Sequence, residues 1–547
     1  MRVSQRKLVW LLVSLFTILW FGSLDYRHLV KPDEGRYAEI SREMANSDDW
    51  ITPRLNGIKY FEKPPLQYWM TALAFNAFGV NEWTARLWTA LCGFLGTVVV
   101  GLGAKRLYGL KIAWLSVLFL ATNFFYVALS HINTLDMGLT FFLTLSLVAF
   151  LLAQHAPRSS REQQLWMLVA WSAAAGAVLS KGLIGVVIPS ATLVIYSLTQ
   201  RDWTPWRQLN VLPGLLIFLA ISVPWFVAVS LRNPEFPYFF FIHEHVLRYA
   251  THMHRRDEPW WIFLPILLIG LMPWTIAAVA GIVNELKIKS IAGQFSAQRF
   301  LLIWCGFVLV FFSLSGSKLP AYILPLFPPL ALLLGRYVSQ ISAKVLLWNG
   351  AVGLVVGLVA LVVLPLALHA REQWPEFSLY HHYSQWLAVA MSVLTAGSGL
   401  CLYLTKQRGI TSALVVLGIS GFLMSMLGLL GHENLALSNS SYHIALQIKP
   451  LLRADIPLYS VKMYDQTLPF YLNRTVTLVD YHDEFEYGLK QQPEKSIPTL
   501  TEFETVWRNG QPALAVMTPE RYQAFIAQQL PMRLVARDSW RVIIATE

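Results

Sequence analysis

Apolar runs long enough to cross a lipid bilayer recur along most of this 547-residue chain. A membrane-spanning helix needs roughly 17–25 predominantly apolar residues. Only 14% of the residues are charged and the mean hydropathy is +0.48, whereas a soluble domain keeps about a quarter of its residues charged. The chain lacks the polar surface that a soluble fold of this size requires. We therefore predict an α-helical polytopic membrane protein.

The apolar runs predict about thirteen spans. The expected segments are 9–24, 86–104, 112–130, 137–154, 166–180, 182–199, 212–230, 260–281, 300–315, 321–336, 346–368, 385–403 and 410–431. The first follows a basic start without a small-residue cleavage site, so we interpret it as a retained signal anchor.

Basic residues cluster between alternate spans and predict the orientation of the chain. Arg2, Arg6 and Lys7 precede the first span, and further clusters occur at 105–111, 201–207, 287–289 and 406–408. The positive-inside rule assigns such clusters, and the N-terminus, to the cytoplasm. The net charge of +11 then needs no nucleic-acid partner. The long loops at about 25–85 and 231–259 are expected on the outer face, which in a bacterium is the periplasmic side of the inner membrane.

The composition changes after residue 431. Residues 432–547 contain charges, prolines and short β-rich runs, and the order of 457–461, a helical stretch and 475–479 predicts a βαβ unit. We therefore expect two domains: a transmembrane catalytic domain, 1–431, and a small extracytoplasmic α/β domain, 432–547.

The first outer loop contains two stretches with helical periodicity. In 33–46, Tyr37, Ile40 and Met44 recur at helical spacing with charges opposite, and 64–78 has a similar pattern. Such a pattern predicts an amphipathic helix at the membrane interface.

Carboxylates and lysines beside the spans are the first candidate functional residues. Asp33 and Glu34 follow the first span, although an acidic pair can simply cap a helix. Asp136 lies between two apolar runs, where an ionisable group is costly unless it has a function. Lys318 and Lys181 have comparable positions, although Lys181 can merely separate two helices. Glu62 and Lys63 form either a functional pair or a weak surface ion pair.

The second long outer loop carries a His-Glu-His sequence and several arginines. Two histidines with a carboxylate suit a divalent metal such as zinc, but His243 and His245 would point about 200° apart on a helix. A surface cluster is the alternative interpretation. Arg248 suits phosphate, because its guanidinium is a planar fork of donors. With the aromatic residues beside the bilayer, these groups favour an anionic amphiphile as ligand.

Four motifs, in order, resemble a known family. They are PDEGRYAEISREM at 32–44, YFEKP at 60–64, the Leu-Asp pair at 135–136 and GSKLPAYILP at 316–325. The chain resembles the bacterial lipid A aminoarabinose transferases, within the polyprenyl-phosphate-sugar-dependent glycosyltransferases of the GT-C membrane fold. The resemblance covers approximately residues 1–340.

The resemblance implies transfer of 4-amino-4-deoxy-L-arabinose from undecaprenyl phosphate to lipid A phosphates, with membrane lipids as further partners. It implies catalytic roles for Asp33, Glu34 and Asp136. Substrate-binding residues implied by the same motifs and positions are Lys63 (for the carrier phosphate), Arg248, Lys318, Tyr322, Tyr37 and Tyr60. It also favours a divalent metal (zinc or magnesium) at Glu62, His243 and His245.

Other functions remain open at this point. Another sugar or acceptor fits the same motifs, including a hexosamine moved to lipid A or an O-mannosyl-type transfer to protein. A transporter or flippase would show repeated halves or paired Gly/Pro-interrupted spans, which we do not find. A scaffold without catalysis is a further alternative.

Overall fold

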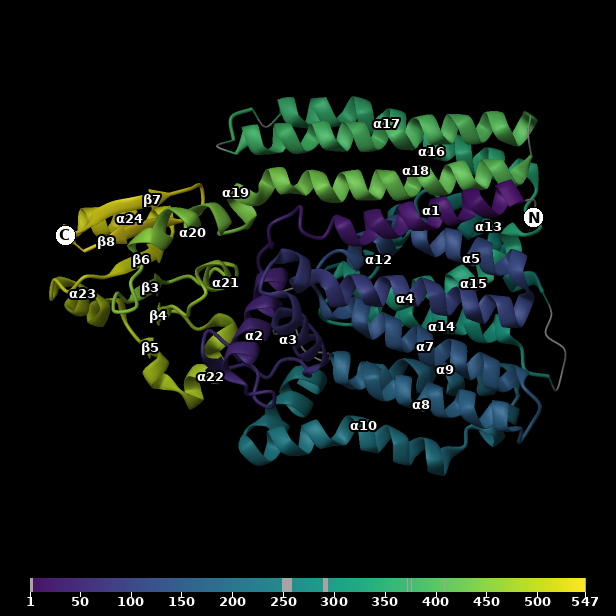
Figure 1. Ribbon diagram of the computed structural model, residues 1–547, viewed down its shortest axis with the longest axis horizontal. Coiled ribbons are helices and arrows are strands. Elements are labelled where there is room, and N and C mark those ends of the chain that lie inside the picture. Colours follow the sequence, from purple (N-terminus) through teal and green to yellow (C-terminus); the bar gives the residue numbers. More distant parts are fainter. Residues whose placement is uncertain are drawn as a thin grey trace.

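The computed structural model describes residues 3–247, 258–288, 294–370, 372–374, 376–407 and 409–546. Long helices lie side by side and form most of the molecule, and a smaller domain with a β-sheet caps one end of them (Figure 1). The N-terminus lies at the opposite end of the helices from this sheet, and α2 and α3 lie between the two parts.

Helices coincide with every predicted apolar run. Their bounds are α1 Val3–Gly22, α4 Glu82–Tyr108, α5 Leu110–Thr122, α6 Phe124–Ser130, α7 Leu135–His155, α8 Arg161–Lys181, α9 Ile184–Gln200, α10 Val211–Arg232, α12 Phe263–Gly270, α13 Thr275–Lys287, α14 Ala297–Leu314, α15 Phe327–Val338, α16 Ala343–His369, α17 Phe377–Gln407 and α18 Ile410–Gly431. Within the described residues, eight helices are long and apolar enough to cross a membrane, or up to ten if each bent pair is one span. The helical membrane class is confirmed, and the number thirteen stays a prediction.

Two predicted spans are not straight. The run 112–130 divides into α5 and α6, with a bend of 65° between them. The run 260–281 divides into α12 and α13, with a bend of 112°. Asn123 caps α6 by accepting a hydrogen bond from the Tyr126 amide. Pro273 lies in the break before α13 and has no N–H to continue a helical ladder. Apolar character alone does not report such breaks.

The first outer loop folds into α2 (Asp33–Ser47), the strands β1 (Arg54–Leu55) and β2 (Ile58–Lys59), and α3 (Leu66–Phe78). The two helices occur where periodicity predicts them. The charged positions of α2 are not left open opposite the apolar ones, because Glu34, Glu39 and Arg42 are buried as well. The C-terminal domain covers this face: the Arg42 guanidinium donates to Asn473 Oδ1 at 2.7 Å.

The C-terminal domain contains one six-stranded sheet. Its strands are β3 Leu458–Val461, β4 Thr477–Val479, β5 Ser496–Ile497, β6 Leu514–Met517, β7 Arg533–Arg537 and β8 Val542–Ala545, in the spatial order β5-β4-β3-β6-β8-β7. Strands β5, β4, β3 and β6 are parallel, and β8 pairs antiparallel with β6 and β7. The predicted βαβ unit is confirmed: α21 (Leu468–Leu472) connects β3 to the parallel strand β4. The remaining α-helices of this region are α19 Ala436–Asn439, α20 Tyr442–Ile448, α22 Glu486–Gln491, α23 Leu500–Arg508 and α24 Pro519–Ala527.

One hydrophobic core joins the outer loop to the C-terminal sheet. Tyr37 and Ile40 of α2 pack in the same cluster as Leu458 and Leu478 of the sheet. Gly35 permits this packing, because a Cβ atom there would lie 2.7 Å from the backbone carbonyl carbon of Gln466. The acidic segment is therefore held between the membrane helices and the sheet.

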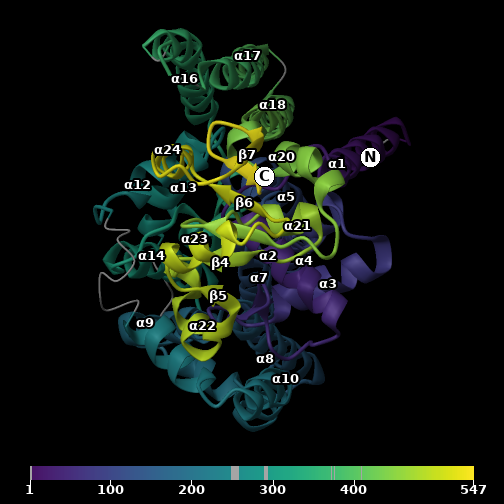
Figure 2. The same ribbon diagram turned by 90° about the vertical axis from the view of Figure 1, so that its left-hand side faces the viewer.

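The last three long helices lie at one edge of the molecule. Viewed from the C-terminal domain, α16 and α17 stand apart from the other helices, with α18 beside them (Figure 2). Helix α10 lies at the opposite edge in both views.

Candidate active site

Adjacent carboxylates at the start of α2 have different environments. The side chain of Asp33 is 39% exposed and accepts a hydrogen bond from Arg36 Nη1 at 2.9 Å. The side chain of Glu34 is 2% exposed and is bound by Arg86 Nε and Nη2 at 2.7 and 2.8 Å. Since helical neighbours point about 100° apart, only one of them can face the open side of α2. Asp33 is thus the accessible carboxylate.

Glu34 organises the loop around it. Its carboxylate also accepts hydrogen bonds from the Val30 amide at 3.1 Å and the Asn133 amide at 3.0 Å. Burial raises the pKa of Glu34, but the charge and hydrogen bonds of Arg86 outweigh burial and lower that pKa to about 2. Arg86 additionally donates to the carbonyl oxygens of Leu24, Arg27 and His28. This geometry favours a structural role for Glu34 over direct chemistry.

Asn133 connects the carboxylate regions to one another. Its amide N–H binds Glu34, and its side-chain oxygen accepts from Gln67 Nε2 of α3 at 2.8 Å. Asn133 lies three residues before Asp136, which occupies the first turn of α7. The elements that carry Asp33, Lys63 and Asp136 are therefore tied together at one end of the membrane helices.

The C-terminal domain contributes a carboxylate to this region. Arg36 Nε donates to Glu484 Oε2 at 2.6 Å, and Gln466 Nε2 donates to the other oxygen at 2.6 Å. Burial raises the pKa of Glu484, partly against the charge of Arg36. Glu484 has no local sequence signal, because it is a lone glutamate 448 residues from Arg36.

Tyrosines line the same region. Tyr37, Tyr60 and Tyr68 are buried, and among the described residues the hydroxyls of Tyr60 and Tyr68 have no hydrogen-bond partner. Burial, followed by the charge of Asp33, raises the pKa of Tyr37, and the charge of Glu62 acts in the same direction. These hydroxyls stay protonated at neutral pH and can donate hydrogen bonds to a ligand.

Lys63 lies between two carboxylates. Its Nζ atom donates to the Glu62 backbone oxygen at 2.9 Å and lies 3.6 Å from Glu244 Oε2 and 3.9 Å from Glu62 Oε2. Glu244 belongs to the π-helix η2 (Tyr238–Leu247) and contacts His243 Nδ1 at 3.3 Å. Glu244 is the carboxylate of the His-Glu-His sequence, and the structure places it beside Lys63.

The predicted metal ligands do not form a metal cluster within the described part of the chain. Neither Glu62 nor His243 belongs to a group of three or more potential ligands there. The Lys63 ammonium already occupies the space near Glu62 and Glu244, where a metal cation would be repelled. The His245 side chain and the whole of Arg248 lie outside the described residues.

Asp136 pairs with Lys181 across two helices. Lys181 Nζ, at the end of α8, donates to Asp136 Oδ1 and lies 4.6 Å from the centroid of the Tyr322 ring. Tyr322 belongs to the 3-10 helix η3 (Pro320–Leu326), and Lys318, just before it, donates to the Ser315 backbone oxygen at 2.7 Å. The structure therefore groups Asp136 with Tyr322 and gives Lys181 a specific partner, so it does more than separate two helices.

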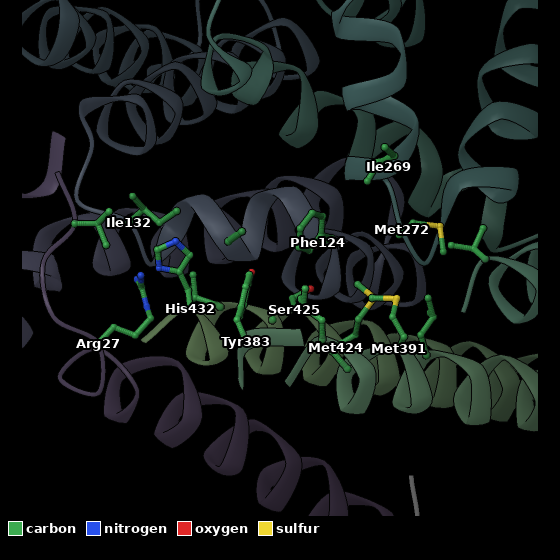
Figure 3. Close-up of a pocket in the computed structure, with 18 of the residues that line it drawn as sticks. Arg27, Phe124, Ile132, Ile269, Met272, Tyr383, Met391, Met424, Ser425 and His432 are labelled. Carbon is green, nitrogen blue, oxygen red and sulfur yellow. The ribbon is translucent and has the colours of Figure 1, made fainter. Parts of the chain in front are cut away.

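A second feature of this region is an apolar groove. It encloses about 430 Å³ and is lined mainly by aliphatic and methionine side chains of α6, α12, α17 and α18. Its polar end holds Arg27, Tyr383 and His432, and its apolar length includes Met424 and Met391 (Figure 3). Arg27 is 4% exposed and donates to the His131 carbonyl oxygen at 2.7 Å. Such a groove suits a hydrocarbon chain with an anionic head.

Comparison with known proteins identifies the class of this fold and site. The sequence matches the family model of dolichyl-phosphate-mannose-protein mannosyltransferase over residues 7–240 and that of the aminoarabinose transferase C-terminal domain over residues 444–546. Together with the helical membrane fold, these matches define a membrane glycosyltransferase.

Individual relatives specify the family. The undecaprenyl phosphate-alpha-4-amino-4-deoxy-L-arabinose arabinosyl transferase of Edwardsiella ictaluri is 33% identical over 421 residues, which cover 75% of this chain and 74% of that protein. The protein of the same name from Pseudomonas aeruginosa LESB58 is 31% identical and covers 93% and 92%. The crystal structure of ArnT from Cupriavidus metallidurans bound to undecaprenyl phosphate superposes with a TM-score of 0.93 at 39% identity, over 98% of both chains. The chain belongs to the undecaprenyl phosphate-aminoarabinose arabinosyl transferase family.

Proposed function

We propose that this chain transfers 4-amino-4-deoxy-L-arabinose from undecaprenyl phosphate to a phosphate group of lipid A. The observation that carries the proposal is that an accessible carboxylate and two partly buried lysines lie at the same end of an apolar helical bundle. Asp33, Lys63 and the Asp136–Lys181 pair supply the charges that a sugar phosphate donor requires. Family membership over nearly the whole chain supports the same reaction.

The carrier phosphate is the leaving group in this reaction. The bond between the sugar C1 and the phosphate oxygen breaks, and negative charge increases on the phosphate. Lys63 would stabilise that charge by its ammonium group, with Arg248 in the same role as the family resemblance implies. In this structure the Lys63 ammonium lies near the Glu62 and Glu244 carboxylates. The carrier phosphate would therefore compete with these two carboxylates for Lys63.

Asp33 would act on the acceptor or the sugar rather than as a general base. A lipid A phosphate is already ionised near neutral pH and needs little proton abstraction before it attacks C1. The Arg36 guanidinium holds Asp33 in place and can also approach an acceptor phosphate. The amino group of the sugar is positively charged. The negative charges of Asp33 and Asp136 would therefore favour binding of this amino sugar over binding of a neutral sugar.

The two lipid partners would enter from opposite edges of the molecule. Lys63 and Glu244 neighbour the aromatic cluster of Trp225 and Phe240 at the α10 edge. The groove with Arg27 lies at the α16–α18 edge (Figures 1 and 3). We assign this groove to acyl chains of the acceptor and the α10 edge to the polyprenyl donor.

The same proposal includes the orientation in the membrane. The N-terminus lies at the far end of the helices from the C-terminal domain (Figure 1). A cytoplasmic N-terminus, as the positive-inside rule favours, implies that the sheet domain, residues 432–547, and the active site are periplasmic in the bacterial inner membrane.

Mass spectrometry of lipid A tests the reaction directly. The host lacks its own transferase, still makes undecaprenyl-linked aminoarabinose, and expresses the wild-type chain, Asp33→Asn or the control Asp25→Asn. Asp25 is an exposed carboxylate on the preceding loop. We expect an aminopentose-sized mass gain with wild type and Asp25→Asn that is absent from Asp33→Asn. A well-inserted wild-type protein that adds no aminopentose would refute the sugar or acceptor assignment, and a hexosamine-sized gain would replace it.

A further inference from the structure

Three potential metal ligands meet at the junction of the membrane helices and the C-terminal domain. His28 lies on the loop after α1, Glu433 on the 3-10 helix η4 (His432–Leu435) after α18, and His443 on α20. One ligand atom from each side chain lies within 4.8 Å of the other two, and His28 Nδ1 is 2.5 Å from Glu433 Oε1. All three residues are half-buried.

This donor set matches the chemistry of a zinc-class cation. Two imidazole nitrogens and one carboxylate oxygen form a common three-ligand zinc set, with water in the fourth position. Metal–ligand bonds of about 2.0–2.2 Å separate tetrahedral donors by about 3.4 Å. The His28–Glu433 separation of 2.5 Å is shorter than that value and the other separations are at most 4.8 Å, so side-chain movements of about 1 Å would bring the donors to zinc-binding distances.

Neighbouring groups already orient the ligands. The backbone amide of His28 donates to Glu433 Oε2 at 2.8 Å, which leaves Oε1 directed at the imidazole. The Tyr442 ring stacks on His28 with centroids 3.7 Å apart, and Tyr471 packs against Tyr442 at 5.2 Å. The hydrogen bond to Glu433 is of the kind that orients ligating carboxylates in metal sites, and the ring contacts restrict rotation of the His28 imidazole.

We propose that His28, Glu433 and His443 bind one divalent transition metal, with Zn²⁺ as the best match. The ion would join three segments that are distant in sequence. Arg86 donates to the His28 carbonyl oxygen at 3.0 Å, so the same loop also contacts the network that holds Glu34. The role is structural, because the site clamps the acidic loop to the C-terminal domain. It uses none of Glu62, His243 and His245 and does not depend on which sugar is transferred.

Zinc binding to the full-length purified protein tests this proposal. The protein is stripped with chelator, dialysed against Zn²⁺ and analysed for bound zinc by elemental mass spectrometry, and Co²⁺ substitution reports the geometry by its visible spectrum. The variants are His443→Gln, His243→Gln and the control His382→Gln, which removes an exposed histidine of α17. We expect His443→Gln to lose one zinc per chain, while both other variants keep that zinc. Zinc should also raise the melting temperature of wild type and not that of His443→Gln.

Two results would overturn the proposal. One is a wild-type protein that binds no zinc, and the other is zinc that His243→Gln removes and His443→Gln leaves in place. If His443→Gln does not fold, His443→Cys keeps a ligand at this position and should retain the ion, with a thiolate–Co²⁺ charge-transfer band. Retained Co²⁺ without that band would equally exclude His443 as a ligand.

Discussion

The Glu34 carboxylate is bound by both Nε and Nη2 of Arg86, at 2.7 and 2.8 Å, whereas its neighbour Asp33 is 39% exposed. The two consecutive acidic residues therefore have different roles. One stabilises the loop, and the other is accessible to substrate.

Glu34→Gln should destabilise the protein by about 3 kcal/mol at pH 7, because it leaves the buried Arg86 charge without its partner. The folded-state pKa of Glu34 is lowered from 4.5 to about 2. Its contribution is therefore complete above pH 4.5 and is lost as the pH falls towards 2. Thermal unfolding in detergent, measured from pH 7 to pH 3, should show the difference between wild type and variant shrinking below pH 4.5. A difference that does not change with pH would contradict this account.

Glu43→Gln should be stabilising at alkaline pH. Burial, followed by the charge of Glu39, raises the pKa of Glu43 from 4.5 to about 8, and its Oε1 atom has no partner among the described residues. The wild type therefore loses stability as the pH rises from 4.5 through 8, since over this range the unfolded chain releases the proton that the folded state keeps. The neutral variant avoids this loss, and above pH 8 it should exceed wild type by about 1 kcal/mol or more. Melting temperatures at pH 6 and 9 test the sign, and equal shifts at both values would refute it.

Gly35→Ala should loosen the contact between α2 and the C-terminal domain. The added Cβ would lie 2.7 Å from the carbonyl carbon of Gln466, a backbone atom that cannot rotate away. We expect a loss of about 1–3 kcal/mol in stability and a lower turnover. Gly22→Ala is the control, because nothing lies within 4 Å of a Cβ there. Equal behaviour of the two variants would show that this close approach is unimportant.

The Asp136–Lys181 pair should behave as one unit in kinetics. Asp136→Asn and Lys181→Met should each lower turnover about 100-fold, and the double variant should resemble the more damaging single variant. Steady-state assays with purified donor and acceptor measure the three values. Lys462→Met breaks an exposed pair with Asp480 in the C-terminal domain and should change turnover less than about twofold. Multiplicative effects of the two active-site substitutions would mean that the side chains act independently.

Met424→Trp should fill the groove that we assign to the acceptor. Met424 lines the 430 Å³ cavity, so a larger ring would exclude an acyl chain. We expect the KM for the lipid acceptor to rise about tenfold, with donor binding unchanged, which corresponds to the loss of about two buried methylene groups. Leu423→Trp is the matched control, because Leu423 is an exposed residue of α18 that does not line the cavity. A rise in donor KM instead would assign the groove to the polyprenyl chain.

The sequence alone determines the elements of this protein and many of its candidate residues. Each apolar run forms a helix because a bilayer requires about 20 apolar residues with every backbone hydrogen bond made internally. The periodicity of 33–46 likewise predicts α2 to within a residue. Asp33 and Asp136 stand out because ionisable groups beside a span are costly without a function.

Tertiary structure alone decides which face of an element is covered and which distant residues meet. Periodicity identifies an apolar face, but it does not reveal that Glu39 and Arg42 on the charged face of α2 are buried too, or that Arg42 contacts Asn473 of the C-terminal domain. Glu484 meets Arg36 across 448 residues, and the run 260–281 bends by 112°. These outcomes depend on packing between elements, whose free energy comes from contacts between segments far apart in the chain, and no local pattern encodes such contacts.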